Sequence, residues 1–341
     1  MKTIITIGSF GFGYGNPSGQ RVKSQNIYYL LKQTGNAVFY VDMIGIWKRP
    51  IAIIQMFYKI WKSDVVFCMP AHRNLVTVFP FICRIAKIRK VPVHYIVVGG
   101  WLADFIEKRN KLQRLLSSIA GIHCQTRELC ETLKKKYGFS NVDVFPNFRI
   151  TDFKSTPYHT SGVLKLVFMA RINKLKGLDN IFFIGELIKK AGLDTVFIDF
   201  YGPIYEEDKL YFEQNLKKYS FMRYVKSLDP SEIYPTLEQY DAMLLPTHYY
   251  TEGFPGSILD AYISGIPVIV TKWKYATEFV EQGQSGLIVP FDDNGTEMFR
   301  EICRINKDED LLKNLKKGAS VKWREYSPVV ARKKLEALFC N

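Results

Sequence analysis

The sequence predicts an α/β protein made of two domains, each built around a doubly wound parallel sheet. The chain has 341 residues, which is more than a single hydrophobic core normally holds. Short apolar runs alternate with longer segments of helical period along the chain, a pattern typical of parallel βαβ units. The alternation stops once, over residues 146–162, where Pro, Gly, Ser and Thr form a linker-like mixture. We therefore expect domains over residues 1–150 and 163–325, and a C-terminal helix over 326–341 as a candidate to cross back to the first domain.

The strand candidates are short and apolar. In the first half they cover residues 3–8, 37–42, 65–69, 91–98, 119–124 and 142–145, and in the second half 165–170, 196–201, 242–246, 267–270 and 287–289. Helices are expected over 20–33, 73–87, 128–137, 178–191, 207–218, 257–264 and 277–282, with three more near the C-terminus. Ligands of open parallel sheets bind beyond the carboxyl ends of the strands, so we expect a site in a cleft between two such sheets.

The composition indicates a globular protein of a reducing compartment. Lys2 and the apolar run after it soon meet glycines, which fits a first strand better than a signal peptide. The uncharged, largely apolar stretch of residues 91–103 is shorter than the ~20 apolar residues that span a bilayer. The six cysteines are scattered, without a CxxC pair or a His at ligand spacing, which argues against zinc and disulfides. We expect a cytoplasmic protein with no bound metal.

The positive charge is concentrated in the first third of the chain. Residues 1–103 contain thirteen Lys and Arg and only two acids, Asp42 and Asp64, so they carry +11 of the total +14. Such a surface attracts anionic partners, including lipid headgroups and nucleic acid. Residues 46–62 and 81–90 combine bases with large apolar side chains, and two interpretations stay open: helices on an anionic membrane, or core-packing helices with solvated bases. No recognised nucleic-acid motif accompanies the charge, so nucleic acid is not an expected partner.

The strongest local signal lies in residues 248–261, with the sequence HYYTEGFPGSILDA after the apolar run AMLLP. Glu252 lies in the expected loop, and Asp260 lies about two turns along the helix that opens near Pro255. Proline fits the first turn of a helix, because the N–H it lacks has no partner there. Free N–H groups at a helix start cradle an anion or a hydroxyl. Two carboxylates at the two ends of this short element suit a ligand with several hydroxyls.

These residues resemble the retaining glycosyltransferases of family 4, the group 1 glycosyltransferases of GT-B fold. The family hallmark is a Glu, seven residues and a second Glu, within a pattern close to E-G-F-P-x-S-x-L-E-A. Four further segments are similar to family motifs and follow in the same order: Pro146-Asn147, Arg171 to Lys176-Gly177, Gly202-Pro203 and residues 278–290. Five matches in register make a specific signal.

The resemblance implies a metal-independent, cofactor-free hexosyl transfer from a UDP- or GDP-sugar to an acceptor hydroxyl, with retention, in the synthesis of cell-surface polysaccharide or glycolipid. It implies that Glu252 holds hydroxyls of the donor sugar and that Asp260 binds the ribose. Arg171 and Lys176 would neutralise the diphosphate. The other donor-site residues it implies are Gly253, Phe254, Ser257, Gly202 and Pro203. The acceptor would be a sugar or a lipid-linked sugar, which suits a peripheral position on the inner face of the cell membrane.

The chain departs from the family pattern at the sugar end of the site. The second acid is Asp260 instead of Glu, so its carboxylate reaches one methylene less far. The His-Gly pair that often follows the fourth strand is absent, because residues 97–101 have the sequence VVGGW. Either Gly100 and Trp101 or His72 would take its place.

The glycine-rich loop of residues 8–21 is the remaining site candidate. Its glycine spacing matches a dinucleotide fingerprint only weakly, so we interpret it as the family's flexible loop. Ser18, Gly19 and Arg21 are expected to contact the donor phosphate and the acceptor. Two other classes of protein stay open: a GT-B sugar-nucleotide epimerase, for which we identify no acid/base constellation, and a non-catalytic protein that binds sugar nucleotides or anions.

Overall fold

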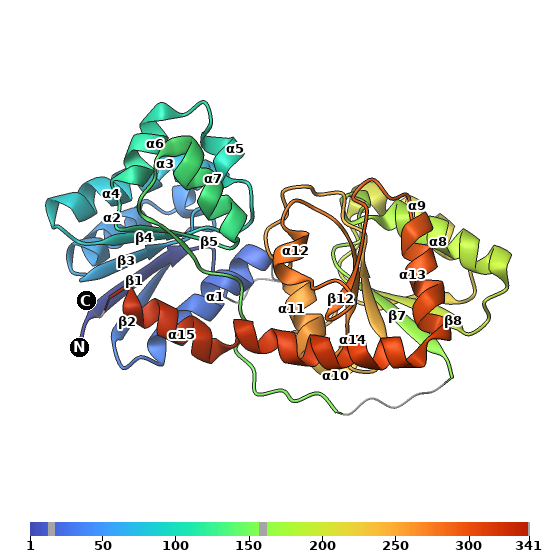
Figure 1. The fold of residues 1–341 in the computed structure, drawn as a ribbon. Coiled ribbons are helices and arrows are strands. Elements are labelled where there is room, and N and C mark those ends of the chain that lie inside the picture. The colour runs from blue at the N-terminus through green and yellow to red at the C-terminus, as the bar shows by residue number, and fades with distance from the viewer. Residues whose placement is uncertain (13–17, 157–161, 340–341) are drawn as a thin grey trace. The chain divides into compact units, whose positions relative to one another are not determined.

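The computed structural model describes residues 1–12, 18–156 and 162–339, which form two α/β units (Figure 1). The first unit contains Met1–Ile150 and Tyr326–Asn341, and the second contains Thr151–Glu325. The C-terminal segment therefore belongs to the first unit. In its helix α15 (Pro328–Ala337), Ala331 and Leu335 enter the first core, and Lys334 Nζ donates to Val144 O at 3.0 Å.

The first unit is built on a six-stranded parallel sheet. Its order is β2 (Ala37–Asp42), β1 (Thr3–Gly8), β3 (Val65–Cys68), β4 (Val93–Ile96), β5 (Gly121–Cys124) and β6 (Val142–Val144). The chain leaves β1 toward one edge through α1 (Gly19–Lys32) and later crosses to the other edge. Right-handed crossovers therefore place α1 on one face of the sheet and the following helices on the other.

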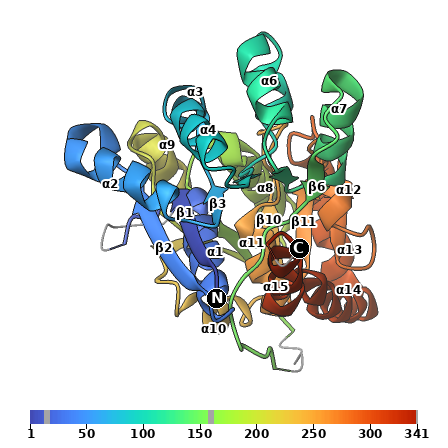
Figure 2. The ribbon, with the colours of Figure 1, turned by 90° about the vertical axis from the view of Figure 1, so that its left-hand side faces the viewer.

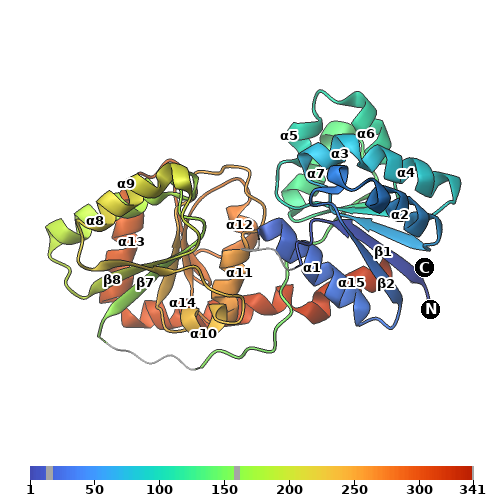
Figure 3. The same cartoon turned by 180° about the vertical axis from the view of Figure 1, so that it is seen from behind.

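Two views from different sides show these two layers of helices (Figures 2 and 3). Helices α1 and α15 lie together on one face. The opposite face carries α2 (Pro50–Trp61), α3 (His72–Thr77), α4 (Phe79–Ile88), α5 (Leu102–Ile106), α6 (Asn110–Ser117) and α7 (Arg127–Tyr137), with the 3-10 turn η1 (Ile46–Lys48) before α2.

The second unit repeats this plan. Its parallel sheet has the order β12 (Gly286–Val289), β11 (Val268–Thr271), β10 (Ala242–Leu245), β7 (Leu164–Met169), β8 (Val196–Tyr201) and β9 (Met222–Lys226). One face carries α8 (Leu178–Ala191), α9 (Glu206–Leu216) and α13 (Thr296–Lys307), and the other carries α10 (Ile233–Leu237), α11 (Gly256–Ile263) and α12 (Ala276–Phe279). Helix α14 (Glu309–Lys322) packs against α11 and α13. The remaining 3-10 turns are η2 (Lys174–Lys176) and η3 (Trp323–Tyr326).

The expected fold class, two doubly wound parallel sheets with flanking helices, is confirmed. The structure differs from the expected element list in several places: α5, α6 and α10 lie in segments for which no helix was named, and two further differences have a clear physical reason. The helix expected over residues 73–87 is broken at Val78, and Pro80 opens a second helix, α4, because proline fits a first turn and disrupts an interior one. Strand β9 was not expected. It is an edge strand with a weak apolar pattern.

No helix among the described residues is long and apolar enough to cross a membrane. Five cysteines, Cys68, Cys83, Cys124, Cys130 and Cys303, are free. Cys340 lies outside the described residues.

Two buried histidines on neighbouring strands make the first unit sensitive to acid. His94 Nδ1 and His123 Nε2 lie 3.0 Å apart, and burial lowers the pKa of His94 to about 4 and the pKa of His123 to about 3. The unfolded chain, with an ordinary histidine pKa of about 6.5, binds more protons than the folded one between about pH 6.5 and pH 4. Stability is therefore expected to fall as the pH drops through this range, by at most about 1.4 kcal/mol per pH unit for each histidine.

Urea unfolding at about pH 7 and about pH 5 measures this loss. The variant His123→Gln, whose amide does not titrate, is expected to lose less stability over the same interval. An equal loss in the variant and the native protein would show that the histidine pair does not cause it.

Candidate active site

The candidate site lies where the strand order of the second sheet reverses. Strands β7 and β10 are neighbours, and the chain continues from β7 to one edge of the sheet and from β10 to the other. Such a switch point leaves room for a ligand beyond the carboxyl ends of the two strands. The turn after β7 and the loop after β10 are joined there, because His248 N donates to Leu175 O at 2.9 Å.

Local sequence fixes the turn after β7. Asn173 Oδ1 accepts a hydrogen bond from Lys176 N at 3.1 Å and so caps η2. Gly177 follows with φ +83°, and a Cβ at this position would overlap the carbonyl oxygen of Pro246. Only glycine combines this left-handed backbone with such a close approach. The Lys-Gly pair thereby sets Lys176 against the loop after β10.

Lys176 and Glu252, which the sequence proposed separately, form an ion pair. Lys176 Nζ bonds to Glu252 Oε1, and their side chains are only 10% and 14% exposed. Thr247 Oγ1, which is fully buried, donates to Glu252 Oε2 at 3.0 Å. Both carboxylate oxygens are therefore held in place. Each keeps lone pairs for a ligand hydroxyl, because a carboxylate oxygen accepts more than one hydrogen bond.

Arg171 lies at the carboxyl end of β7, and its exposed guanidinium contacts Tyr205 in the loop after β8. Its Nη1 donates to Tyr205 Oη at 3.0 Å, and its Cζ lies 5.6 Å from the centre of the Tyr205 ring. Gly202, with φ +129°, permits this arrangement, because a Cβ there would overlap Ala170 O. Pro203 O accepts from Ile172 N at 2.9 Å. These contacts join Arg171 to the Gly202-Pro203 turn and do not connect it to Lys176.

The residues after Glu252 lead into α11. Gly253 and Phe254 are buried, and the Phe254 ring stacks on Phe279 with centroids 4.0 Å apart and planes 2° apart. Ser257 is partly exposed in the first turn of α11. Asp260 is only 4% exposed on the same helix, so its expected contact with a ribose remains a prediction.

A polar chain behind the loop was not expected from the sequence. His248 Nε2 lies 2.7 Å from Asn180 Oδ1, and Asn180 Nδ2 donates to Asp293 O at 2.6 Å. Asn180 is buried on α8, whereas His248 is exposed. These hydrogen bonds and Thr247 fix the backbone around Glu252. The sequence motifs include neither Thr247 nor Asn180, and only the position of Thr247 just before the loop could have drawn attention to it.

In the first unit, the two alternatives for the missing family histidine lie together. The rings of His72 and Trp101 stack with centroids 3.6 Å apart, after the neighbouring strands β3 and β4. Trp101 Nε1 donates to Val98 O at 2.7 Å, which holds the indole beside Gly99 and Gly100. Partial burial, and then the Arg109 charge, lower the pKa of His72, so its ring is neutral near pH 7 and can accept a hydrogen bond.

The described part of the glycine-rich loop is ordered by local contacts. Ser18 caps α1, accepting from Arg21 N at 3.4 Å, and Gly19 is exposed in the first turn. Asp42 accepts from Phe10 N at 3.1 Å and Gly11 N at 2.8 Å, so it organises the start of the loop. Residues 13–17 of the loop lie outside the described part of the chain.

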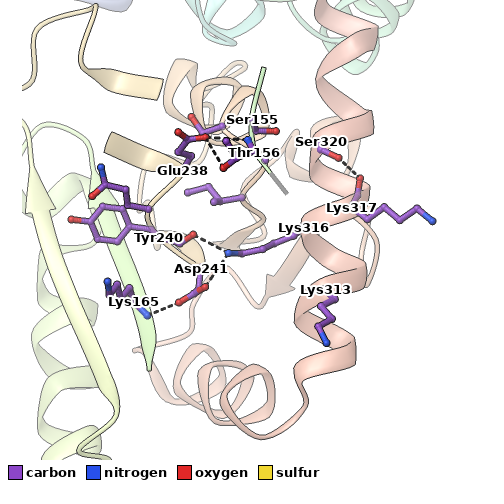
Figure 4. Close-up of a pocket in the computed structure, with 14 residues that line it drawn as sticks. Ser155, Thr156, Lys165, Glu238, Tyr240, Asp241, Lys313, Lys316, Lys317 and Ser320 are labelled. Atoms are coloured by element: carbon purple, nitrogen blue, oxygen red, sulfur yellow. Dashed lines mark hydrogen bonds and ion pairs between the residues drawn. The ribbon is translucent and has the colours of Figure 1, made fainter. Parts of the chain in front are cut away.

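A hollow of about 480 Å³ lies at the amino-terminal edge of the second sheet, opposite the candidate site (Figure 4). Lys316 Nζ donates to Asp241 Oδ1 at 2.9 Å and to Tyr240 O at 3.1 Å, and Asp241 Oδ2 accepts from Lys165 N at 2.8 Å. These contacts join α14 to the starts of β7 and β10, which is a structural role. Among the described residues no group of His, Cys, Asp and Glu is arranged to hold a metal ion.

Two similar six-stranded parallel sheets in two units define the GT-B class of fold. Residues 164–308 match the family model described as glycosyl transferases group 1. The matched segment lies in the second unit, which is therefore similar to group 1 glycosyltransferase domains, and it contains Arg171, Lys176, Glu252 and Asp260.

Solved structures and a curated relative agree with this class. Anabaena HepE in complex with UDP-glucose has a TM-score of 0.76 and 14% identity, with 100% of both chains covered. Sucrose-phosphate synthase from Thermosynechococcus elongatus has a TM-score of 0.79 and 12% identity, covering 100% of this chain and 98% of that one. A chitobiosyldiphosphodolichol beta-mannosyltransferase of Debaryomyces hansenii is 23% identical over 251 residues, which are 62% of this chain and 53% of the relative. The chain thus matches about half the length of this curated relative.

Proposed function

We propose that the protein is a retaining glycosyltransferase that moves a sugar from a nucleoside diphosphate sugar to an acceptor hydroxyl. The observation that carries the proposal is the Lys176–Glu252 pair at the switch point of the second sheet. In this proposal Lys176 is the cation for the leaving diphosphate, and Glu252 is the carboxylate that binds the sugar hydroxyls. A transferase needs both, since negative charge grows on the diphosphate while the sugar must be held in place.

The proposed reaction proceeds on one face of the sugar. The bond between the anomeric carbon and the diphosphate oxygen breaks, the acceptor oxygen bonds to the same face of that carbon, and the leaving phosphate oxygen takes the acceptor proton. Glu252 is poorly placed to act as a nucleophile, because Lys176 and Thr247 engage both of its oxygens. Its role in this scheme is to bind and orient the donor sugar.

Lys176 and Arg171 would stabilise the diphosphate without a metal ion, and no cofactor takes part. Asp260, Gly253 and Ser257 would contact the nucleotide and the sugar from the loop and helix after β10. The donor is a UDP- or GDP-sugar. HepE was solved in complex with UDP-glucose, which favours testing UDP-sugars first.

The proposed acceptor is a sugar, free or carried on a lipid, in the synthesis of cell-surface polysaccharide or glycolipid. The excess of +11 over residues 1–103 supports an acceptor presented at an anionic membrane. The Debaryomyces relative is named for a chitobiosyldiphosphodolichol, which is a lipid-linked sugar. The site of action would then be the inner face of the cell membrane.

Incubating the protein with a panel of UDP- and GDP-sugars, with and without acceptor sugars and chelator, tests the proposal. NMR of the products is expected to show transfer with the donor's anomeric configuration kept and with no loss of rate in chelator. Epimerised donor without transfer would identify an epimerase, and binding without any turnover would identify a non-catalytic binding protein.

Replacing either cation is expected to weaken binding of the free nucleoside diphosphate. Charge-assisted hydrogen bonds contribute roughly 1.5–3 kcal/mol each, so Arg171→Ala and Lys176→Met should each lower the affinity by about tenfold or more. Calorimetry with the diphosphate that the panel identifies measures the effect. Lys174→Met is the matched control, because Lys174 lies on the same turn with its ammonium over the Tyr211 ring at 4.3 Å. Unchanged affinity in both site variants would contradict the diphosphate assignment.

A further inference from the structure

Helix α2 of the first unit is apolar on the side that faces solvent. Ile51, Ile54, Tyr58 and Trp61 are spaced by three or four residues, so they form one stripe along the helix. Ile51 and Ile54 are 70% and 69% exposed, Tyr58 is 64% exposed and Trp61 44%. Met56 and Ile60 on the opposite side are fully buried. A surface helix normally has one apolar face and one polar face, so this second apolar face lacks a partner within its unit.

The neighbouring elements extend the apolar surface. Helix α4 packs beside α2 and exposes Phe81 by 54% and Ile88 by 65%, and Trp47 of η1 is 49% exposed. An apolar hollow of about 190 Å³ lies between these elements, lined in part by Trp47, Phe57 and Phe81. We call the surface formed by η1, α2 and α4 the α2–α4 face. Scattered exposed apolar residues are ordinary, but a contiguous patch marks an interaction site.

Exposed bases are numerous on and beside the elements that form this patch, and acids are nearly absent from them. The exposed bases on these elements or next to them are Lys48, Arg49, Lys62, Arg84, Lys87, Arg89 and Lys90. Residues 43–103 contain a single acid, Asp64. Two of the bases lie over aromatic rings of the patch, with Arg89 Cζ 5.1 Å from the Trp61 ring centre and Lys62 Nζ 6.0 Å from that of Tyr58.

We propose that the α2–α4 face docks on an anionic lipid bilayer, inserts Ile51, Ile54 and Phe81 below the headgroups and holds Tyr58 at the boundary. A bilayer surface offers negative charge above and hydrocarbon beneath it, and tryptophan and tyrosine favour the boundary between them. The face presents the complementary pattern, with apolar side chains in the middle, aromatic rings beside them and bases around. This inference deepens the proposed function, because it states which surface would bring the enzyme to a membrane-borne acceptor.

A second copy of the chain fits this face less well. A two-fold dimer places the same patch against itself, which would bring two sets of bases together with almost no acid between them. Like charges opposed across an interface disfavour binding strongly. Another protein would have to be acidic and apolar at once, and the experiment below distinguishes that case.

Flotation with lipid vesicles tests the proposal on the full chain. The vesicles are phosphatidylcholine alone, or phosphatidylcholine with about a third of phosphatidylglycerol. We expect binding to the anionic vesicles only, reduced at high salt because salt screens the bases. The pair of substitutions Ile51→Ser and Ile54→Ser leaves the charge unchanged and is expected to lower partitioning by about tenfold or more, since each inserted isoleucine buries apolar area. Leu210→Ser, at a 67% exposed position of α9, is the matched control and should have no effect.

The depth to which the α2–α4 face enters the bilayer is measured by quenching of tryptophan fluorescence with brominated lipids. Trp47 and Trp61 are expected to be quenched, and Trp47→Phe combined with Trp61→Phe should remove most of the quenching. Absence of flotation, binding that the two serine substitutions leave unchanged, or association only with acidic proteins would each overturn the proposal. Failure here is separable from failure of the proposed function, because transfer to a soluble acceptor does not require the α2–α4 face, and Glu252→Gln should float like the native protein.

Discussion

Glu252→Gln is expected to lower turnover by about 100-fold, the usual size of a lost transition-state contact, while the protein stays folded. Glutamine keeps the shape of the side chain and an oxygen for Thr247 Oγ1, which now lies 3.0 Å from Oε2. It removes the negative charge that faces Lys176 and the sugar hydroxyls. The donor affinity should change less than the turnover if Glu252 acts mainly on the reacting sugar.

The choice of glutamine over alanine follows from the ion pair. Lys176 is 10% exposed in its side chain, and removing one partner of a buried pair typically costs about 3–5 kcal/mol of stability. Glutamine also removes the charge, but it keeps an oxygen that accepts a hydrogen bond from the Lys176 ammonium, whereas Glu252→Ala would leave that ammonium with no acceptor and would mix a loss of folding with a loss of chemistry. Glu186→Gln is the control, because Glu186 pairs with Lys190 at 3.4 Å on the exposed side of α8. Steady-state kinetics with saturating donor, together with thermal unfolding, measures both effects. A folded Glu252→Gln protein with near-native turnover would remove Glu252 from the reaction.

Elements with a strong local pattern could be predicted closely from the sequence. Strands β1, β2 and β8 and helix α8 have the expected bounds, because the strands are short apolar runs, the helix has a clear helical period, and glycines or polar residues end them. Strand β9 escaped notice because most of its residues are exposed or partly so and it pairs on one side only. The break between α3 and α4 depended on Pro80, which the helical period around it concealed.

The sequence of α2 left two interpretations open, and the structure explains why. Apart from Gln55 and Lys59 the helix is apolar, so periodicity cannot tell which of its apolar sides faces the core. In the structure, one apolar side packs inward through Met56 and Ile60, and another apolar side is exposed at Ile51 and Ile54. Each of the two interpretations accounts for one of these sides.

The candidate site was predicted as separate residues and not as an arrangement. Lys176 and Glu252 were recognised from motifs 76 residues apart, and nothing in either motif states that their side chains touch. Thr247 and Asn180 were missed because a neutral side chain that fixes a neighbour leaves no mark on composition or charge. Asp260 was expected to reach a ribose, but its burial on α11 depends on tertiary packing that the spacing from Glu252 does not reveal.

Gly177→Ala is expected to destabilise the second unit by roughly 2–5 kcal/mol, the sum of two costs. The left-handed backbone at φ +83° contributes about 1–2 kcal/mol for any residue with a Cβ. Overlap of that Cβ with the carbonyl oxygen of Pro246 contributes about 1–3 kcal/mol more, as for other overpacked sites. The neighbour is backbone at the end of β10, so it cannot rotate away, and the turn after β7 must move instead.

Gly192→Ala separates these two causes. Gly192 ends α8, the helix that Gly177 begins, and it has φ +61°, but a Cβ there would meet no other atom within 4 Å. Its variant should lose only the backbone contribution of about 1–2 kcal/mol. Urea unfolding compares the two proteins, and calorimetry adds a functional readout. Since moving the turn draws Lys176 away from Glu252, Gly177→Ala should also bind the nucleoside diphosphate more weakly, whereas Gly192→Ala should bind it normally. Equal destabilisation in both variants, with equal nucleotide affinity, would mean that the contact between Gly177 and Pro246 does not hold the site together.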